Sequence, residues 1–176
     1  MAQGAPTGGT EAQTDLMPEA RRLEITGLHH VTLICSSIDR AVGFYRDLLG
    51  MRLVKQTRNH DDPSARHLYF GDSRGAPGTV VSLFEYPDME VGSTGVGSTH
   101  HIALATGSED ELQGWAEYLR SRGVPCTEVL DRVYFKSIYL RDPDGHIVEI
   151  ATSGPGFTVD EPADELGARM IDPPRR

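Results

Sequence analysis

The amino-acid sequence predicts an α+β fold in which two βαβββ modules are related by pseudo-twofold symmetry. The first observation is a duplication, because the segments GLHHVTL and STHHIAL place His30 and His101 71 residues apart, and the same offset relates Gly43 to Gly114. The second is that each copy shows one strand, one helix and then three strands in the same order. An offset that is constant across a strand and a helix indicates a repeated structural unit.

The first module is expected over residues 25–87. Its helix has apolar residues at helical spacing and ends at Gly50, a residue type that often follows the last turn of a helix. Asp-, Pro- and Gly-rich turns separate the later strands. The expected elements are a strand at 28–36, a helix at 38–49 and strands at 51–57, 66–71 and 79–86.

The second module is expected over residues 98–152, after the glycine- and serine-containing linker VGSTGVGST. Its last strand matches the last strand of the first module, since GHIVEI resembles GTVVSL, and this match aligns Glu149 with Ser82. The expected elements are a strand at 100–106, a helix at 109–122 and strands at 126–130, 136–141 and 147–152.

The two ends of the chain differ in composition from the modules. Residues 1–24 are rich in Gly, Ala, Thr and Gln and are expected to form a disordered tail. They contain no basic segment followed by a long apolar run, so no export signal is expected. Residues 153–176 form a C-terminal tail with turn signals and one expected short helix at 163–169.

Charge and cysteine content narrow the expected class of function. The chain has 17 Lys and Arg residues against 26 Asp and Glu residues, a net charge of −9. Without a basic run, binding to nucleic acid or to an anionic membrane is not expected, and a small-molecule ligand is favoured. The two cysteines, Cys35 and Cys126, cannot form a disulfide framework. We therefore expect a soluble protein of the reducing cytoplasm.

Alternation along the strands selects one histidine from each His-His pair. His29 shares a face with Val31, Leu33 and Cys35, which suits the core, so His30 is on the open face with Thr32. The same phase places His101 on the open face of its strand. On the last strand Val148 and Ile150 share one face and Glu149 lies on the other, where burial of its carboxylate is costly without a partner.

Pseudo-twofold symmetry is expected to bring four equivalent positions together, namely His30, Ser82, His101 and Glu149. Two imidazoles and one carboxylate are the ligand set that leaves open positions on a non-haem Fe(II) ion. Serine is a poor ligand, so the fourth position is left to substrate or water. The alternative is that both histidines are hydrogen-bonded core residues, and the symmetric placement with a glutamate in phase favours the metal site.

Several motifs make the sequence similar to the vicinal oxygen chelate superfamily, which includes glyoxalases, bleomycin resistance proteins and extradiol dioxygenases. They are LHHVTL, FYRDLLGMRLVKQT, HLYFGD, APGTVV, HHIAL and YFKSIYLRDPDGHIVEIAT, and the resemblance covers about residues 25–172. Within the superfamily the chain most resembles ring-cleaving dioxygenases of the hydroquinone type. The resemblance implies one vicinal oxygen chelate domain with Fe(II) bound by His30, His101 and Glu149, surrounded by His29, Thr32, His100, Arg132 and Tyr139.

The chain departs from the similar dioxygenases in length. Those proteins usually carry four modules in a chain about twice as long, whereas this chain has two. The complete ligand triad is kept, but the walls of the substrate pocket are reduced. We therefore expect a homodimer in which a partner chain supplies missing walls.

The side chains around the metal have expected roles in binding and proton transfer. Tyr139 could hydrogen-bond a substrate oxygen or act as an acid, or be only a half-exposed strand residue. Arg132 could hold a phenolate or an anionic ring substituent, or be only a surface arginine. Thr32 is expected to orient the ring, and His29 or His100 to manage protons. The remaining histidines are interpreted as structural, namely His60, His67 and His146.

The leading hypothesis is an Fe(II)-dependent enzyme that uses dioxygen to open the ring of a hydroquinone- or catechol-like diol. One alternative is a glyoxalase-like isomerase or thiol transferase that uses Mn(II), Ni(II) or Zn(II). A lactoylglutathione lyase is disfavoured by Ser82, because those enzymes place a fourth protein ligand there. Another alternative is a non-catalytic drug-binding module of the same superfamily.

Overall fold

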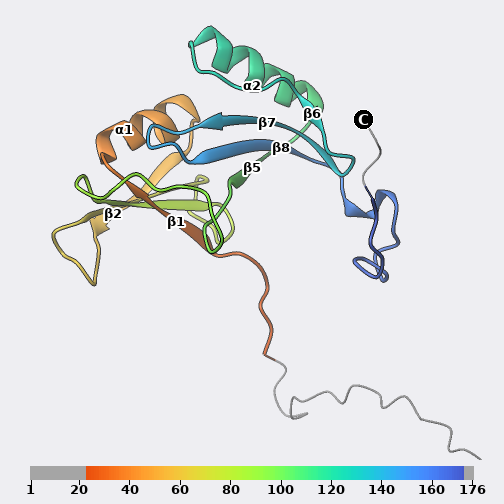
Figure 1. The fold of residues 1–176 in the computed structure, drawn as a ribbon, viewed down its shortest axis with the longest axis horizontal. Helices are drawn as coiled ribbons and strands as arrows, with labels where there is room; N and C mark the ends of the chain where they lie inside the picture. The colour runs from red at the N-terminus through yellow and green to blue at the C-terminus, as the bar shows by residue number, and fades with distance from the viewer. Residues whose placement is uncertain (1–22, 173–176) are drawn as a thin grey trace, which may run out of the picture.

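The computed structural model describes residues 23–172 and contains two four-stranded sheets (Figure 1). The first has the order β1-β4-β3-β2 and the second has the equivalent order β5-β8-β7-β6. In each sheet the first strand of the module pairs in parallel with the last, and the other pairs are antiparallel. The strands are β1 (His30–Cys35), β2 (Arg52–Arg58), β3 (Arg66–Gly71), β4 (Val80–Glu85), β5 (Ile102–Thr106), β6 (Leu130–Asp131), β7 (Phe135–Arg141) and β8 (Ile147–Pro155).

The repeated connectivity confirms the predicted α+β fold of two βαβββ modules. The strand register shows that single residues are equivalent in the two modules. Thr32 pairs with Ser82 in the first sheet, and Ala103 pairs with Glu149 in the second. Thr32 and Ala103 differ by the same 71 residues as the two histidine pairs. Ser82 and Glu149 therefore occupy equivalent places in the two sheets, as the sequence comparison predicted.

One helix covers each sheet, and each begins at a serine that caps its first turn. Ser37 accepts a hydrogen bond from the backbone N–H of Arg40, and Ser108 accepts one from that of Glu111. α2 (Glu109–Ser121) matches the prediction. The predicted helix of the first module is divided, since α1 (Ile38–Val42) continues into a wider π-helical segment, η1 (Gly43–Leu48), before Gly50 ends it with a φ of 72°.

The core lies between each sheet and its helix, and the strand phases are those that the sequence predicted. On β1, Leu33 and Cys35 are buried, while Thr32 and Ile34 on the other face are exposed. His29 is exposed like His30, so the expected place of His29 on the core face is not observed, because the residue lies just before the strand begins. On β5, Ile102 is buried, whereas Ala103 and the preceding His101 are exposed. The candidate histidines are therefore exposed, whereas Glu149 and Ser82 are buried.

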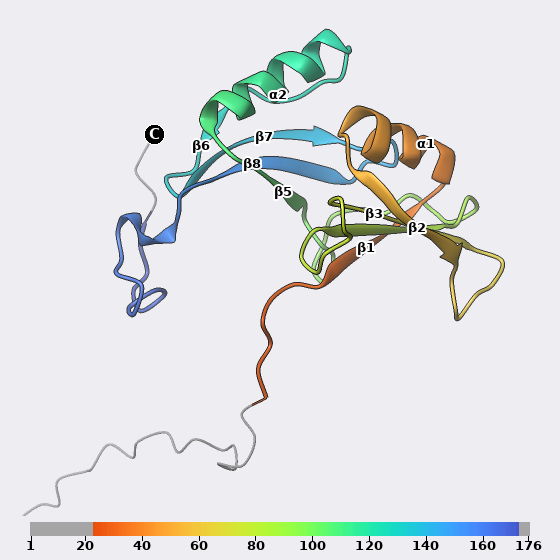
Figure 2. The same ribbon diagram turned by 180° about the vertical axis from the view of Figure 1, so that it is seen from behind.

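The first helix lies against the turn between β7 and β8 (Figure 2), and side-chain contacts there join the two modules. The hydroxyl of the fully buried Tyr45 donates a 3.0 Å hydrogen bond to Asp142, which also contacts His146 at 2.8 Å. Ser36 donates to Asp144, and the Arg40 guanidinium donates to the carbonyl oxygen of Pro143. The modules therefore sit side by side, with the end of one sheet against the helix of the other module.

Two predicted elements differ from the structure. Residues 126–129 form no strand, and only Leu130–Asp131 pairs with β7. Thr127 instead makes two separate hydrogen bonds to the backbone of Tyr139: its N–H donates to the Tyr139 carbonyl oxygen, and its hydroxyl oxygen accepts from the Tyr139 N–H. The helix predicted at 163–169 is wrong. This segment forms turns between Pro162 and Gly167, and the tail instead contains a short 3₁₀ helix, η2 (Phe157–Val159).

Part of the predicted N-terminal tail, residues 1–22, and residues 173–176 lie outside the described residues. Among the helices formed by residues 23–172, none is long and apolar enough to cross a bilayer.

Candidate metal and substrate site

The second module brings a buried carboxylate, an imidazole and a phenol into contact. Glu149 is 2% exposed, and its Oε2 lies 3.0 Å from Nε2 of His101. Its Oε1 accepts a 2.7 Å hydrogen bond from the hydroxyl of Tyr139, the residue opposite Glu149 on the neighbouring strand. The predicted cost of burying this carboxylate is thus offset by two polar partners.

The same pair fits the donor geometry of a metal ion. Two donors that are each about 2.1 Å from one ion and at a right angle to each other are about 3.0 Å apart. The distance between His101 Nε2 and Glu149 Oε2 is the same. A neutral imidazole and a carboxylate are also ligands that suit iron, manganese, nickel and zinc. These two residues therefore fit adjacent positions on one metal ion.

The histidine pairs have the same geometry in both modules. Nδ1 of His101 lies 2.9 Å from Nδ1 of His100, and Nδ1 of His30 lies 3.0 Å from Nδ1 of His29. In each pair the rings meet edge to face. A hydrogen bond at one ring nitrogen fixes the tautomer and directs the other nitrogen to a ligand position. His29 and His100 are therefore placed to orient their neighbours.

The first module contributes a separate set of polar groups. On its open face Thr32 Oγ1 and Ser82 Oγ are 2.8 Å apart, next to His30 on the same strand. Within residues 23–172, no three His, Cys, Asp or Glu side chains come together as a metal site. The expectation that His30, Ser82, His101 and Glu149 meet within one chain is therefore not met.

The two modules meet through the first helix. It contacts the turn after β7 through Tyr45 and Asp142, and the two sheets lie side by side (Figures 1 and 2). The choice of His30, His101 and Glu149 as ligands remains a prediction. The structure places His101 and Glu149 together in the second module, and His30 lies in the first.

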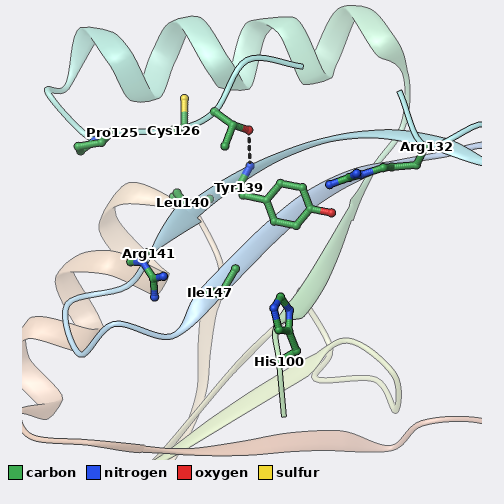
Figure 3. Close-up of a pocket in the computed structure, with 9 residues that line it drawn as sticks. His100, Pro125, Cys126, Arg132, Tyr139, Leu140, Arg141 and Ile147 are labelled. Carbon is green, nitrogen blue, oxygen red and sulfur yellow. Dashed lines mark hydrogen bonds between the residues drawn. The ribbon is translucent and has the colours of Figure 1, made fainter. Parts of the chain in front are cut away.

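A cavity of about 610 Å³ is lined in part by Tyr139, whose hydroxyl contacts Glu149 (Figure 3). This size suits a small organic ligand. Glu149 and His101 themselves are not among its lining residues. The Arg132 guanidinium lies over the Tyr139 ring, 5.3 Å from its centroid, and the Tyr139 backbone N–H donates to Thr127. The cavity is lined by residues that include His100, Cys126, Arg132, Tyr139, Arg141 and Ile147.

The sequence prediction placed Tyr139, Arg132 and His100 near one site, and the cavity contains all three. It did not include Arg141. The available signal was strand alternation, because Arg141 lies two residues after Tyr139 and shares its face. Cys126 also lines the cavity, and both cysteines are free thiols. Burial raises the pKa of the Cys35 thiol to about 12, which makes it a poor nucleophile.

Of the three histidines interpreted as structural, two have defined environments. His67 is buried between the rings of Tyr69 and Phe84, and neither of its ring nitrogens has a hydrogen-bond partner. Burial lowers the pKa of His67. His146 instead bonds to Asp142, which raises the pKa of His146.

Two named relatives are each about twice as long as the matched region of this chain or longer. The chain is 33% identical over 148 residues to the Bacillus subtilis (strain 168) protein named "Putative ring-cleaving dioxygenase MhqA", covering 84% of this chain and 46% of that protein. It is 34% identical over 123 residues to the chlorohydroquinone/hydroquinone 1,2-dioxygenase of Sphingobium indicum, covering 68% of this chain and 38% of that enzyme. The chain thus spans less than half the length of these two relatives.

A shorter relative has a different name. The chain is 31% identical over 132 residues to the metallothiol transferase FosB of Staphylococcus haemolyticus, covering 73% of this chain and 84% of that protein. Among solved structures, a dioxygenase-named crystal structure from Bacillus subtilis matches with a TM-score of 0.68 and 34% identity, over 74% of this chain and 42% of that one.

The family model described as the Glyoxalase/Bleomycin resistance protein/Dioxygenase superfamily matches residues 27–150. This range begins before β1 and ends within β8, so it includes both modules and the Glu149–Tyr139 pair. The chain therefore belongs to the glyoxalase, bleomycin resistance protein and dioxygenase superfamily.

Proposed function

We propose that the protein is an Fe(II)-dependent ring-cleaving dioxygenase that acts on a hydroquinone- or catechol-like diol. The observation that carries this proposal is the buried Glu149 carboxylate, which contacts His101 and Tyr139 beside a cavity large enough for an aromatic ring. The names of the two longer relatives point in the same direction. The extradiol type of cleavage is part of the proposal.

In this proposal His101 and Glu149 provide two ligands and His30 the third. When bound, a ferrous ion supplies the Lewis-acid and electron-transfer chemistry that ring opening by dioxygen requires. The ligand set also fits Mn(II), Ni(II) or Zn(II), and the requirement for dioxygen as co-substrate favours iron. His29 and His100 hold the two imidazoles in a single tautomer through their Nδ1 contacts.

The residues around the cavity bind the diol and handle its proton. The Tyr139 hydroxyl is held by Glu149, so it is positioned to exchange a proton with a substrate oxygen that lies near the carboxylate. The Arg132 guanidinium covers one side of the cavity and favours a phenolate over a neutral phenol. In the first module, Thr32 carries the hydroxyl that is nearest in sequence to His30, and this hydroxyl is proposed to orient the ring.

We further propose that two copies of the chain form a homodimer that completes the site. His30 and the Glu149–His101 pair lie in separate modules that do not face each other within one chain. A second copy can place its His30 face against the Glu149 face of the first, and twofold symmetry then forms two equal sites. Ile34 supports this arrangement, because it shares the open face of β1 with His30 and is 46% exposed.

Oxygen uptake by the iron-loaded protein tests the reaction. Protein reconstituted with Fe(II) without air should consume dioxygen when hydroquinone or catechol is added. 4-Methoxyphenol, which lacks the second hydroxyl, should give no uptake, and neither should Glu149→Gln. The proposal is rejected if iron-loaded protein consumes no dioxygen with any hydroquinone or catechol offered.

A metal-dependent thiol transferase is the second candidate, and the match to a protein of that name supports it. The metallothiol transferase relative matches over 84% of its own length, whereas the dioxygenase relatives match over less than half of theirs. This candidate predicts turnover that requires a thiol and consumes no dioxygen. The presence of Cys35 and Cys126 as free thiols fits a reducing cytoplasmic location, which is proposed for either enzyme.

A further inference from the structure

Two arginines, Arg132 and Arg141, line the cavity beside Tyr139, and no acidic residue is among its lining residues within the described chain (Figure 3). The whole chain carries a net charge of −9, so this cavity has the opposite sign to the average surface. A concave, partly apolar site with two uncompensated cations attracts small anions. The cavity is therefore expected to bind an anion.

Arg141 lines the same cavity as Tyr139. It is the last residue of β7 and lies two residues after Tyr139, about 6.6 Å along the same face of the strand. Its guanidinium donates one 2.7 Å hydrogen bond to the carbonyl oxygen of Gly145. A guanidinium has five N–H donors in a planar fork, so most of its donors remain available.

The carboxylates next to Arg141 in sequence are bound elsewhere. Asp142 accepts hydrogen bonds from Tyr45 and His146, and its side chain is buried. Asp144 accepts from Ser36 and pairs with Arg40. Neither aspartate therefore neutralises Arg141, and no ion pair within 4.0 Å involves Arg141 among residues 23–172.

Arg132 is held over the other side of the Tyr139 ring. Its backbone lies in the short turn between β6 and β7, where Val133 has a φ of 71° and its N–H donates to Asp131 Oδ1. A positive φ is unfavourable for a β-branched residue, and it persists where the surrounding structure holds the backbone in that conformation. The turn directs Arg132 over the ring, so the phenol of Tyr139 lies between two cationic side chains.

We propose that Arg141 binds the anionic substituent of the substrate, which is an aromatic diol that carries a carboxylate on its ring. The inference rests on the proposed function for the diol part and deepens it by naming the substrate class. Guanidinium groups bind carboxylates through paired N–H donors in one plane. Arg141 is the specificity-determining residue, because it distinguishes a charged ring from a neutral ring of the same size.

Binding of a matched pair of probes tests the proposal. The probes are 2,5-dihydroxybenzoate and its methyl ester, which differ in charge but keep the same ring and hydroxyls. Calorimetric titration of the Fe(II)-loaded protein without dioxygen measures binding in the absence of turnover. The acid should bind about tenfold or more tightly than the ester, the range for hydrogen bonds to charged groups. Added salt should weaken binding of the acid and leave the ester unchanged.

Three variants identify the residue that is responsible. Arg141→Gln should reduce the preference for the acid to near unity, and Arg141→Lys should keep part of it. Arg52→Gln is the matched control, because Arg52 is also an exposed strand-end arginine that donates to a loop carbonyl oxygen, that of Ser73. This control should keep the full preference. Thermal unfolding of each variant identifies any that fails to fold.

The proposal is overturned if the acid and the ester bind equally, if the acid does not bind at millimolar concentration, or if folded Arg141→Gln keeps the full preference. Oxygen uptake with unsubstituted hydroquinone separates this outcome from failure of the proposed function. Uptake without a preference for the acid retains the dioxygenase and rejects the carboxylate site. A preference that depends on Arg141, without oxygen uptake from any diol, retains the site and rejects the dioxygenase.

Discussion

The hydroxyl of Tyr139 donates a 2.7 Å hydrogen bond to Oε1 of Glu149, across directly paired positions of β7 and β8. Glu149 Oε2 lies 3.0 Å from His101 Nε2 on the other side. The carboxylate thus links the candidate ligand His101 to the phenol that lines the neighbouring cavity. A change at Tyr139 is therefore expected to affect both the carboxylate and the bound substrate.

Tyr139→Phe should retain the fold but lower the rate of oxygen uptake. The variant loses the proton of the hydroxyl and leaves Glu149 with one polar partner. Loss of a residue that orients a metal ligand typically costs about 10–100-fold in activity or metal affinity. Oxygen uptake and iron content of purified variant and parent protein measure the two effects. Unchanged uptake would show that the hydroxyl has no role in the reaction.

Tyr45→Phe should destabilise the contact between the modules. The Tyr45 ring is fully buried, and its hydroxyl is hydrogen-bonded to Asp142 of the other module. Removing a hydrogen bond to a charged group is expected to lower the free energy of unfolding by about 1.5–3 kcal/mol. Urea titration measures the change. Tyr86→Phe is a suitable control, because Tyr86 contacts Asn59 within one module and is half-buried, so its effect should be smaller.

This contact also marks the limit of what the sequence predicts about the fold. The repeat of 71 residues predicts both sheets, and alternation predicts that Leu33 and Cys35 are buried. Both patterns can be read directly from the order of residues along the chain. The bond between Tyr45 and Asp142 joins residues 97 positions apart, and no periodicity indicates such a pair. For the same reason the sequence does not predict how the two modules are placed.

His67 should make the protein less stable as the pH falls. Burial, followed by nearby His30 and His60, lowers the pKa of His67 in the folded chain below the 6.5 of an ordinary histidine. The unfolded chain therefore takes up a proton first, and stability is lost as the pH falls below about 6.5. His67→Phe should thus gain stability relative to the parent as the pH is lowered from 7 to 5.

Urea titrations at several pH values measure this difference. Phenylalanine keeps an aromatic ring between Tyr69 and Phe84 and removes the two unpartnered nitrogens. If the difference in free energy of unfolding between His67→Phe and the parent does not change with pH, then His67 does not carry this dependence.

His146 should give the opposite dependence of stability on pH. Its hydrogen bond to Asp142 raises the pKa of His146 although burial opposes the charge. Asp144 adds to the increase. A raised pKa means that the folded chain holds the proton more tightly, so the stabilisation is present below pH 6.5 and is lost as the pH rises through the folded value. The destabilisation caused by His146→Gln should therefore be larger at pH 5.5 than at pH 8.5. A destabilisation that is equal at both pH values contradicts this role.

The candidate site was predictable where one strand or one repeat carries the information. Strand phase selects His30 and His101, and the match of GTVVSL with GHIVEI selects Glu149. The contact between Tyr139 and Glu149 follows from antiparallel pairing of β7 with β8, which the sequence predicts only as neighbouring strands. The separation of His30 from Glu149 was not predictable, because it depends on how the modules dock.

In the proposed dimer, His30 of one copy joins His101 and Glu149 of the other copy in one iron site. His30→Ala and Glu149→Ala should each be inactive alone. When the two variants are unfolded together, refolded and loaded with Fe(II), half of the dimers should be mixed, and each mixed dimer should contain one intact site of two. Oxygen uptake should then recover to about a quarter of that of the parent protein.

A mixture of His101→Ala and Glu149→Ala is the matched control. Both changes lie in the same module, so neither site of a mixed dimer is intact and no uptake should be recovered. Uptake of about a quarter in the first mixture and none in the second is the predicted result. No recovery in the first mixture, from a parent protein that is active and dimeric after the same treatment, would contradict the shared site.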